Sequence, residues 1–227
     1  MHIKKYKRNA VGHILLHNEQ SFARSKRENV NNSETNKNYN FVSGTGIDNL
    51  RKVLNCSDVH VSKRKDLNVV CSLVLTAPQN LPISREREFY KYAFEFFNSR
   101  WHCPCISAWV HNDEKKKYIN SKTNKVVWSR SHVHYTFVPL VYDKQKEKYK
   151  VCAKEVVNKK DLQTLHYDFK KYIDKKMNLD LEIINGATEG VNKTILELKN
   201  TTLKRNIKKL EALKKRVQNE IERELCR

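Results

Sequence analysis

The chain has 227 residues, which is enough for one domain and an appendage. Its 45 Lys and Arg against 25 Asp and Glu give a net charge of +20 and a pI of about 9.7. So large an excess disfavours acidic partners of modest charge and favours a polyanion, nucleic acid first and an anionic membrane surface second.

No apolar run approaches the length of a membrane span, and the first residues lack the apolar core of a signal peptide. We therefore expect a cytoplasmic protein without stable membrane insertion. In a reducing cytosol most of the six cysteines are small core residues. A zinc site formed by His102, Cys103 and Cys105 is disfavoured, because no fourth ligand has a clear spacing.

The N-terminal part of the chain predicts a strand, a helix and a polar loop before the next strand. The expected elements are a strand over 1–6, a helix beginning near Asn9 or Gly12 and ending at Phe22, a loop over 25–38 and a strand over 39–42. The loop is rich in Asn and lacks apolar periodicity, so we expect a mobile segment that becomes ordered over a ligand.

The rest of the chain continues the mixture of strands and helices. The expected elements are a helix over 47–56, a buried strand over 69–76, a helix capped by Ser84, strands over 105–111 and 131–141, an extended segment over 148–156, a helix from Asp161 and an extended segment over 181–184. This order predicts an α+β fold with one mainly antiparallel sheet and helices packed behind it. Val133, Tyr135 and Phe137 would face those helices.

Three histidines flank a basic segment between two of the predicted strands. Side chains alternate along a strand, so His132 and His134 share one face. If the two strands pair antiparallel, His111 lies beside them, and three imidazoles can hold one metal ion with room for a substrate oxygen. Asp113 and Glu114 are placed to orient the metal-bound rings. The alternative is that the histidines are only polar residues of a half-solvated strand.

The segment between these histidines, over 115–130, predicts a long hairpin with a Lys-rich face. Its cations can follow a phosphate backbone, and its aromatic side chains can stack on unpaired bases. The candidate DNA-binding residues are Arg24, Lys115, Lys116, Lys117, Tyr118, Trp128 and Arg130. The alternative for the two aromatic residues is that they pair only with each other.

The histidine motifs resemble those of a known family. His111-Asn112-Asp113-Glu114, His132-Val133-His134 and Pro139 resemble the metal motif of the MobV (Pre/Mob) plasmid mobilization relaxases, which are His-hydrophobic-His endonucleases. In that family the two halves of the motif are a few residues apart, whereas here the basic hairpin lies between them. The resemblance extends over roughly residues 1–199.

A second motif lies on the first predicted helix. His17-Asn18-Glu19-Gln20 resembles the family's HNxR motif, with Gln20 in place of the arginine and Arg24 one turn further along. The resemblance implies that His17 is the nucleophile of a relaxase that nicks one strand at an origin of transfer. The 5′ end would stay attached to the protein, so that the strand can be rejoined without ATP and the plasmid mobilized.

The resemblance also implies a divalent metal ion and a DNA partner. The ion would be manganese or magnesium, with zinc as a further candidate, since three imidazoles bind zinc or manganese more readily than magnesium. Glu114 would accept a proton from His17 and so activate the nucleophile. The DNA would be the hairpin and the single strand of the transfer origin.

Two other functions remain open. Asn38-Tyr39 resembles another motif of the family, and Tyr39 is the rival nucleophile because many relaxases of other families use tyrosine. A rolling-circle replication initiator or a transposase would use Tyr39 in this way, although a strand aromatic more often packs on a neighbour. The other possibility is a basic DNA-binding protein that has a structural metal and no enzymatic activity.

The C-terminal part of the chain has a heptad pattern. Leu196, Leu203, Leu210 and Val217 recur every seven residues, with Ile207 and Ile221 between them. This pattern predicts a helical extension over 196–227, after a relaxase domain over 1–195, and a coiled-coil homodimer. The alternative is a single amphipathic helix, because about four heptads is the lower limit for predicting a coiled coil.

Overall fold

A computed structural model describes residues 1–19, 30–114, 117–119 and 126–183, together with residues 203, 207, 210, 211 and 214. The chain divides into two compact units, Met1–Ile184 and Asn185–Arg227. Each unit is described by itself below. The first unit carries the predicted site.

The centre of the first unit is a five-stranded sheet in the order β1-β4-β8-β5-β2. Its strands are β1 (His2–Lys7), β4 (Asn68–Thr76), β8 (His132–Phe137), β5 (Cys105–His111) and β2 (Tyr39–Asn40). Every neighbouring pair is antiparallel. β-branched and aromatic residues fill the three central strands, as their preference for a pleated surface predicts. The mainly antiparallel sheet of the predicted α+β fold is therefore confirmed.

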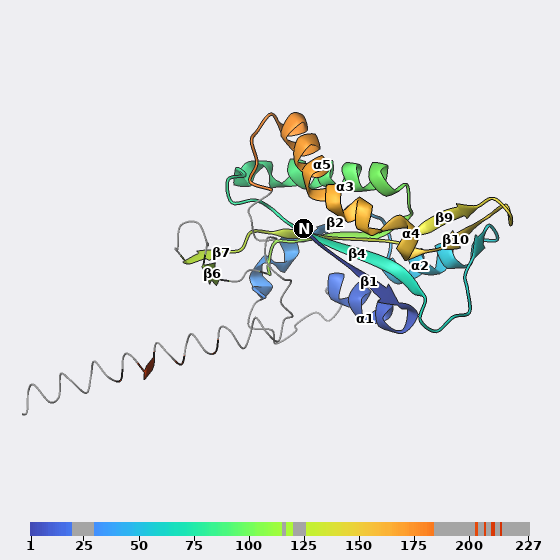
Figure 1. The fold of residues 1–227 in the computed structure, drawn as a ribbon. Helices are drawn as coiled ribbons and strands as arrows, with labels where there is room; N and C mark the ends of the chain where they lie inside the picture. The colour runs from blue at the N-terminus through green and yellow to red at the C-terminus, as the bar shows by residue number, and fades with distance from the viewer. Residues whose placement is uncertain are drawn as a thin grey trace, which may run out of the picture. The chain divides into compact units, whose positions relative to one another are not determined.

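One face of this sheet is covered by α3 (Glu86–Trp101) and α5 (Lys159–Met177), which lie on the same side of it (Figure 1). Phe89, Phe97 and Phe169 are fully buried there, together with Tyr135 and Phe137 of β8. The prediction that alternate residues of β8 face helices is thus confirmed. The prediction that Ser84 caps α3 is wrong.

The helix instead follows a short 3-10 turn, η2 (Ile83–Arg85), and Arg85 occupies the cap position without a side-chain hydrogen bond. The next long helix has a conventional start. Asn158 precedes α5, and its side-chain oxygen accepts a hydrogen bond from the backbone N–H of Asp161 at 2.9 Å.

The opposite face of the sheet carries α1 (Arg8–Asn18) and α2 (Gly46–Leu54) (Figure 1). Val11 and Leu15 of α1 are buried in a second apolar cluster with Val70 and Ile106 of the sheet. Helices therefore cover both faces of the sheet, and not just the face behind the site on which they were expected. This position of α1 brings His17 and Asn18 to the face on which the other three histidines lie.

The chain departs from the prediction after β8. The expected continuous strand over 131–141 is two strands, because Val138 and Pro139 separate β8 from β9 (Leu140–Asp143), and proline has no N–H for a ladder. A smaller sheet joins β9 antiparallel to β10 (Lys148–Val151) and β10 parallel to β3 (Val59–His60). The extended segment predicted to 156 ends earlier, in the short helix α4 (Ala153–Val156).

Two further segments lie near the site. The loop expected over 25–38 contains a 3-10 helix, η1 (Asn32–Lys37). The hairpin expected over 115–130 contains β6 (Lys117–Ile119) paired antiparallel with β7 (Val126–Trp128).

In the second unit five residues are described, and all are helical and exposed: Leu203, Ile207, Leu210, Glu211 and Lys214. Among the described residues of the whole chain, no helix has both the length and the apolar character needed to cross a membrane.

Candidate active site

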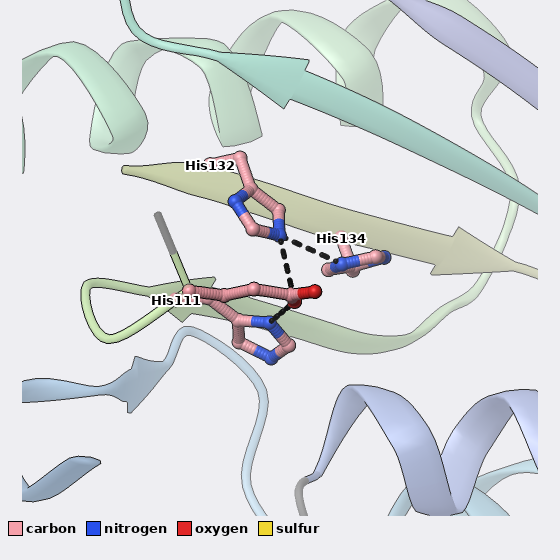
Figure 2. Close-up of side chains that lie close together, drawn as sticks. His111, His132 and His134 are labelled. Atoms are coloured by element: carbon pink, nitrogen blue, oxygen red, sulfur yellow. Dashed lines mark hydrogen bonds and ion pairs between the residues drawn. The ribbon is translucent and has the colours of Figure 1, made fainter. Parts of the chain in front are cut away.

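Antiparallel pairing of β5 with β8 brings the three histidines together. His111 at the end of β5 lies opposite His132 at the start of β8, and Trp109 lies opposite His134. His132 and His134 therefore share a face with His111, as the alternation along the strands predicts. The ring centroids are 4.8–5.1 Å apart. Figure 2 shows the three rings turned toward one another.

The distances within this group suit a shared metal ion. His111, Glu114, His132 and His134 each offer one ligand atom, and these atoms lie within 4.8 Å of one another. The Nε2 atoms of His132 and His134 are 3.1 Å apart, and Oε2 of Glu114 is 3.6 Å from Nε2 of His132 and from Nδ1 of His111. Atoms bound to one ion at about 2.0–2.2 Å lie roughly 3 to 3.6 Å apart in tetrahedral geometry.

The protonation of His111 is set by a neighbouring carbonyl group. Its Nε2 donates a hydrogen bond of 2.7 Å to the backbone oxygen of Asn18, so Nδ1 carries the lone pair. This Nδ1 is buried and has no hydrogen-bond partner in the described part of the chain. A buried lone pair without a donor costs free energy, which a bound cation would offset. The residues present therefore fit a metal ion.

His134 is held neutral by its surroundings. Burial lowers the pKa of its ring well below the ordinary value, and the neighbouring His111 and His132 add to this effect. A metal ligand must be an unprotonated imidazole, so the environment favours the ligand form.

Glu114 has a different position from the one predicted. Interaction with the protonated form of the His111 ring is the largest cause of a pKa lowered to about 2, and the nearby His132 also lowers it, against the effect of burial. The carboxylate lies among the three imidazoles, so the group offers three nitrogens and one oxygen as candidate donors. The sequence predicts Glu114 behind the ligands because spacing alone does not give the path of the chain after β5.

Asp113 binds the segment that contains η1. Its Oδ2 accepts a hydrogen bond of 2.7 Å from the hydroxyl of Thr35, and its backbone oxygen accepts one of 2.9 Å from the N–H of Asn31. These bonds attach the segment around η1 to the end of β5. The part of the loop that is described is thus anchored next to the cluster.

His17 lies beside the cluster. Its ring centroid is 5.5 Å from that of His134 and 6.1 Å from that of His111, and both pairs are edge to face. Its helix ends one residue later, at Asn18, so the ring projects from the last turn of α1 toward the sheet. A group bound by the three histidines and Glu114 would be within reach of this imidazole.

Asn18 is a site residue that the sequence analysis missed. It is fully buried, its Nδ2 donates to the hydroxyl of Thr136 at 3.1 Å, and this hydroxyl is also hydrogen-bonded to that of Ser72 at 3.0 Å. With its backbone oxygen bound to His111, Asn18 joins the end of α1 to both site strands. The only signal in the sequence was a polar residue next to His17.

The chain was compared with known families and structures. A family model described as plasmid recombination enzyme, Mob_Pre, matches residues 1–182. The chain belongs to the Mob_Pre family. Its fold is similar to that of the MobM relaxase domain (MOBV; Mob_Pre) bound to oriT DNA of plasmid pMV158, in a manganese-bound crystal structure at pH 6.8. The identity is 21%, the TM-score is 0.68, and the match covers 88% of this chain and 96% of that one.

Two further MobM structures give the same result. A manganese-bound complex with a 22-nucleotide oriT DNA at pH 4.6 matches with 20% identity and a TM-score of 0.66, over 88% of this chain and 97% of that one. A complex with a 26-nucleotide oriT DNA matches with 19% identity and a TM-score of 0.59, over 87% and 97%. No curated protein matched the chain.

Tyr39 of this Mob_Pre protein lies on the other face of the sheet. It pairs with Val110, which belongs to the core under α3, and its ring packs there against Phe41 and under the guanidinium of Arg87. Burial is the main cause that raises its pKa to about 12. A phenol on the face away from the three histidines is poorly placed to act as the nucleophile, and the alternatives that use Tyr39 are not favoured.

The predicted DNA-binding residues of the Mob_Pre chain differ in their surroundings. Trp128 is 56% exposed on β7. Arg130 is engaged within the protein, because its guanidinium donates to Glu86 at 2.9 Å and to the backbone oxygen of Gln79 at 3.1 Å. Arg24, Lys115 and Lys116 lie outside the described residues, as do the side chains of Lys117 and Tyr118 on β6.

The disfavoured zinc site is not assembled. Cys103 donates to the backbone oxygen of Leu140 and Cys105 to that of Thr136. Within the described residues, the one group with metal-ligand spacing is that of the three histidines and Glu114.

Proposed function

We propose that this Mob_Pre protein is a relaxase that nicks one strand of DNA at an origin of transfer, keeps the 5′ end covalently, and rejoins the strand during plasmid mobilization. The proposal is carried by one observation, the position of His17. Its ring centroid lies 5.5 Å from that of His134, which belongs to the group of four residues that fit a metal ion. The likeness to oriT-bound MobM supports it.

His111, Glu114, His132 and His134 would hold the ion. When bound, the ion polarises the scissile phosphate and offsets part of its negative charge. Its identity is proposed as manganese, because MobM structures are manganese-bound and because imidazole nitrogens with one carboxylate suit manganese or zinc better than magnesium.

The chemical step is an in-line displacement by His17. Its unprotonated ring nitrogen attacks the phosphorus, a P–N bond forms, and the P–O3′ bond breaks with its electron pair on the 3′ oxygen. That oxygen takes a proton from water and leaves as a hydroxyl, and the hydroxide that remains takes the proton from the other ring nitrogen of His17. The 5′ phosphate stays on His17 as a phosphoramidate. Attack by the 3′ hydroxyl reverses the step, so rejoining needs no ATP.

Glu114 is better suited to binding the ion than to accepting a proton from His17. Its Oε2 lies 3.6 Å from a ring nitrogen of His111 and of His132, which places the carboxylate among the candidate ligands. The fixed end of α1 supports the role of His17 in another way. Asn18 hydrogen-bonds both site strands, so the nucleophile is positioned before DNA binds.

A nicking assay tests this proposal. The full chain, with manganese, should convert a supercoiled plasmid that carries the DNA flanking the gene into its open circle, and should leave protein on the 5′ end. Removal of divalent ions with EDTA should stop the reaction. If the chain binds DNA tightly but no divalent ion produces a nick, the remaining alternative is a DNA-binding protein with a structural metal.

Three finer points are proposals of the same kind. We propose a relaxase domain over 1–195 and a helical extension over 196–227. Leu203, Ile207 and Leu210 are helical and 46–65% exposed, which leaves them available for a homodimer through this extension. We also propose the cytoplasm as the place of action, because plasmid DNA is there.

A further inference from the structure

His132 is the first residue of β8, so its position depends on the chain that leads into this strand. The pairing of β8 with β4 and β5 begins at this residue. Only Ser129, Arg130 and Ser131 separate it from Trp128, where the β6–β7 hairpin ends. A functional side chain has to be held within about 0.5 Å of its working geometry. The contacts of the residues before His132 therefore bear on the metal group.

Ser131, directly before His132, is anchored to α3. Side chains alternate along an extended chain, so Ser131 faces α3 while His132 faces the other candidate ligands. The hydroxyl of Ser131 donates to Oε2 of Glu86 at 2.7 Å. Its backbone oxygen accepts from the hydroxyl of Tyr90 at 2.5 Å and from the N–H of Ala77 at 3.0 Å. Ser131 and Tyr90 are both buried, so these bonds are formed away from solvent.

Arg130 is bound by the same carboxylate. Its Nε donates to Oε1 of Glu86 at 2.9 Å, and its Nη1 donates to the backbone oxygen of Gln79 at 3.1 Å. The side chains of Arg130 and Glu86 are only 15% and 17% exposed. Hydrogen bonds between charged groups are stronger than neutral ones. One carboxylate thus binds both residues that precede His132.

Glu86 is itself on a rigid element. It is the first residue of α3, where a negative charge interacts favourably with the helix dipole. The helix is fixed to the sheet by Phe89 and Phe97, which are fully buried. A group on such an element gives a more precise reference point than a group on a loop.

We propose that Glu86 is a positioning residue of the metal site. It binds Ser131 and Arg130, fixes the start of β8, and so holds the ring of His132 in place from the opposite face of the sheet. Glu86 acts through these residues and not by binding the ion. The proposal rests on the proposed function, since it adds a positioning residue to the metal site of the relaxase.

Two variants remove this link in different ways. Glu86→Gln keeps the size of the side chain, but an amide has one acceptor oxygen and cannot accept from Arg130 and Ser131 together. Ser131→Ala removes only the hydroxyl and keeps the backbone oxygen that binds Tyr90, so it tests the link even if Glu86→Gln does not fold. Isothermal titration of the full chain should show manganese affinity about tenfold lower in Glu86→Gln, with a smaller loss in Ser131→Ala. The double variant should lose no more than Glu86→Gln alone.

The cobalt(II) spectrum gives a readout that lost stability would not move. The visible bands of bound cobalt depend on the number and geometry of its ligands, and cobalt binds the same kinds of donor as manganese and zinc. The folded chain is saturated with cobalt, so a weaker affinity does not affect the comparison. We expect the bands to change in position and intensity in Glu86→Gln, because the ring of His132 is no longer fixed.

Glu88→Gln is the matched control. Glu88 lies in the first turn of α3 as well, and Arg85 donates to its two carboxylate oxygens at 2.7 and 3.0 Å. The change therefore removes a carboxylate and an ion pair from the same turn, whereas the contacts of Glu86 with Arg130 and Ser131 are kept. Manganese affinity and the cobalt spectrum should both stay as in the unaltered chain.

Three results would overturn the positioning role. One is an unaltered chain that binds no manganese, and another is an unchanged affinity and spectrum in Glu86→Gln and Ser131→Ala, whatever their stability in urea. The third is an equal effect of Glu88→Gln, which would assign the change to the charge of the helix end. Nicking is followed separately. If nicking is absent but the metal measurements are as expected, the relaxase proposal fails and the positioning role stands. If nicking occurs and these variants bind metal normally, the positioning role alone fails.

Discussion

At the scale of single residues, the position of His17 beside three imidazoles supports its proposed role as the nucleophile. An imidazole with an ordinary pKa of about 6.5 is largely unprotonated near neutral pH, whereas Tyr39 has a pKa of about 12 and lies on the other face of the sheet. We expect His17→Ala to keep manganese and DNA binding but to lose nicking and covalent attachment. Gel assays of nicking and of the protein–DNA adduct measure this, with Tyr39→Phe as the active control.

The bond in the adduct gives an independent check. A phosphoramidate on histidine breaks in acid and survives alkali, whereas a phosphodiester on tyrosine survives acid better. The adduct of the full chain should therefore be lost after mild acid treatment. An acid-stable adduct, or nicking by His17→Ala, would show that another residue is the nucleophile. Gln20, which stands in the place of the family's arginine, predicts a modest nicking rate because it supplies no charge to the phosphate.

The ligand set can be tested residue by residue. His134→Ala removes a buried candidate ligand from the group, so manganese affinity should fall at least tenfold and nicking should be lost. Glu114→Gln keeps the size of the side chain but removes the charge, and should lower manganese affinity in the same way. Isothermal titration with manganese measures both. Unchanged manganese affinity in Glu114→Gln would show that Glu114 is not a ligand.

At the scale of elements, the site depends on how α1 packs on the sheet. The sequence predicted the histidine pair on β8 and its neighbour on β5, because strand periodicity and antiparallel pairing are local rules. It did not predict the role of Asn18 or the inward position of Glu114. Both depend on contacts between segments that are far apart in the chain, such as the 3.1 Å bond from Asn18 to Thr136.

Errors in the predicted elements have a similar origin. The end of β8 at Phe137 was missed because the apolar run continues through Val138 and Pro139 into β9. Ser84 has the residue type of a helix cap, but η2 occupies the first turn and moves the start of α3 to Glu86. The polar composition of 25–38 predicted a mobile loop but did not predict η1 among its described residues, or the hydrogen bond from Thr35 to Asp113 just after β5. Local propensity does not include such tertiary anchors.

The docking of α1 can be weakened without changing the ligands. Thr136→Val keeps the shape of the side chain but leaves Nδ2 of Asn18 and the hydroxyl of Ser72 without their buried partner. We expect the free energy of unfolding to fall by about 1–3 kcal/mol. The nicking rate should fall more than manganese affinity, because the helix that carries His17 is affected first. Urea denaturation, nicking and titration measure the three quantities.

A remote hydroxyl provides the control for this experiment. Ser99 on α3 donates to the backbone oxygen of Phe96, on the face of the sheet away from the histidines. Ser99→Ala should leave the nicking rate unchanged, whatever its effect on stability. If Thr136→Val changed stability and left nicking unaltered, the bond from Asn18 would have a structural role only.

At the scale of the whole molecule, the division into two units predicts that metal binding and dimerisation can be separated. The first unit contains the complete group of candidate ligands and His17, so it should bind metal without the second. Deleting everything after Lys199 should leave a folded, manganese-binding monomer, whereas the full chain should be a dimer through its exposed leucines. Light scattering measures the mass of each. A full chain that is monomeric at high concentration would reject the coiled-coil dimer.

The net charge of +20 predicts how salt affects DNA binding. Neutralising phosphates releases condensed counterions, so the logarithm of the single-strand binding constant should fall linearly with the logarithm of salt, by about 0.7 for each phosphate contacted. Replacing Lys115, Lys116 and Lys117 together by Gln should reduce this slope by about 2, if all three contact phosphates.

Trp128→Ala should lower affinity at every salt concentration and leave the slope unchanged, because a stacked base releases no counterions. Anisotropy titrations from 50 to about 300 mM salt separate the two effects. A change of slope in Trp128→Ala would mean that β7 contributes to phosphate binding, and an unchanged slope in the Lys variant would remove the hairpin from the phosphate path.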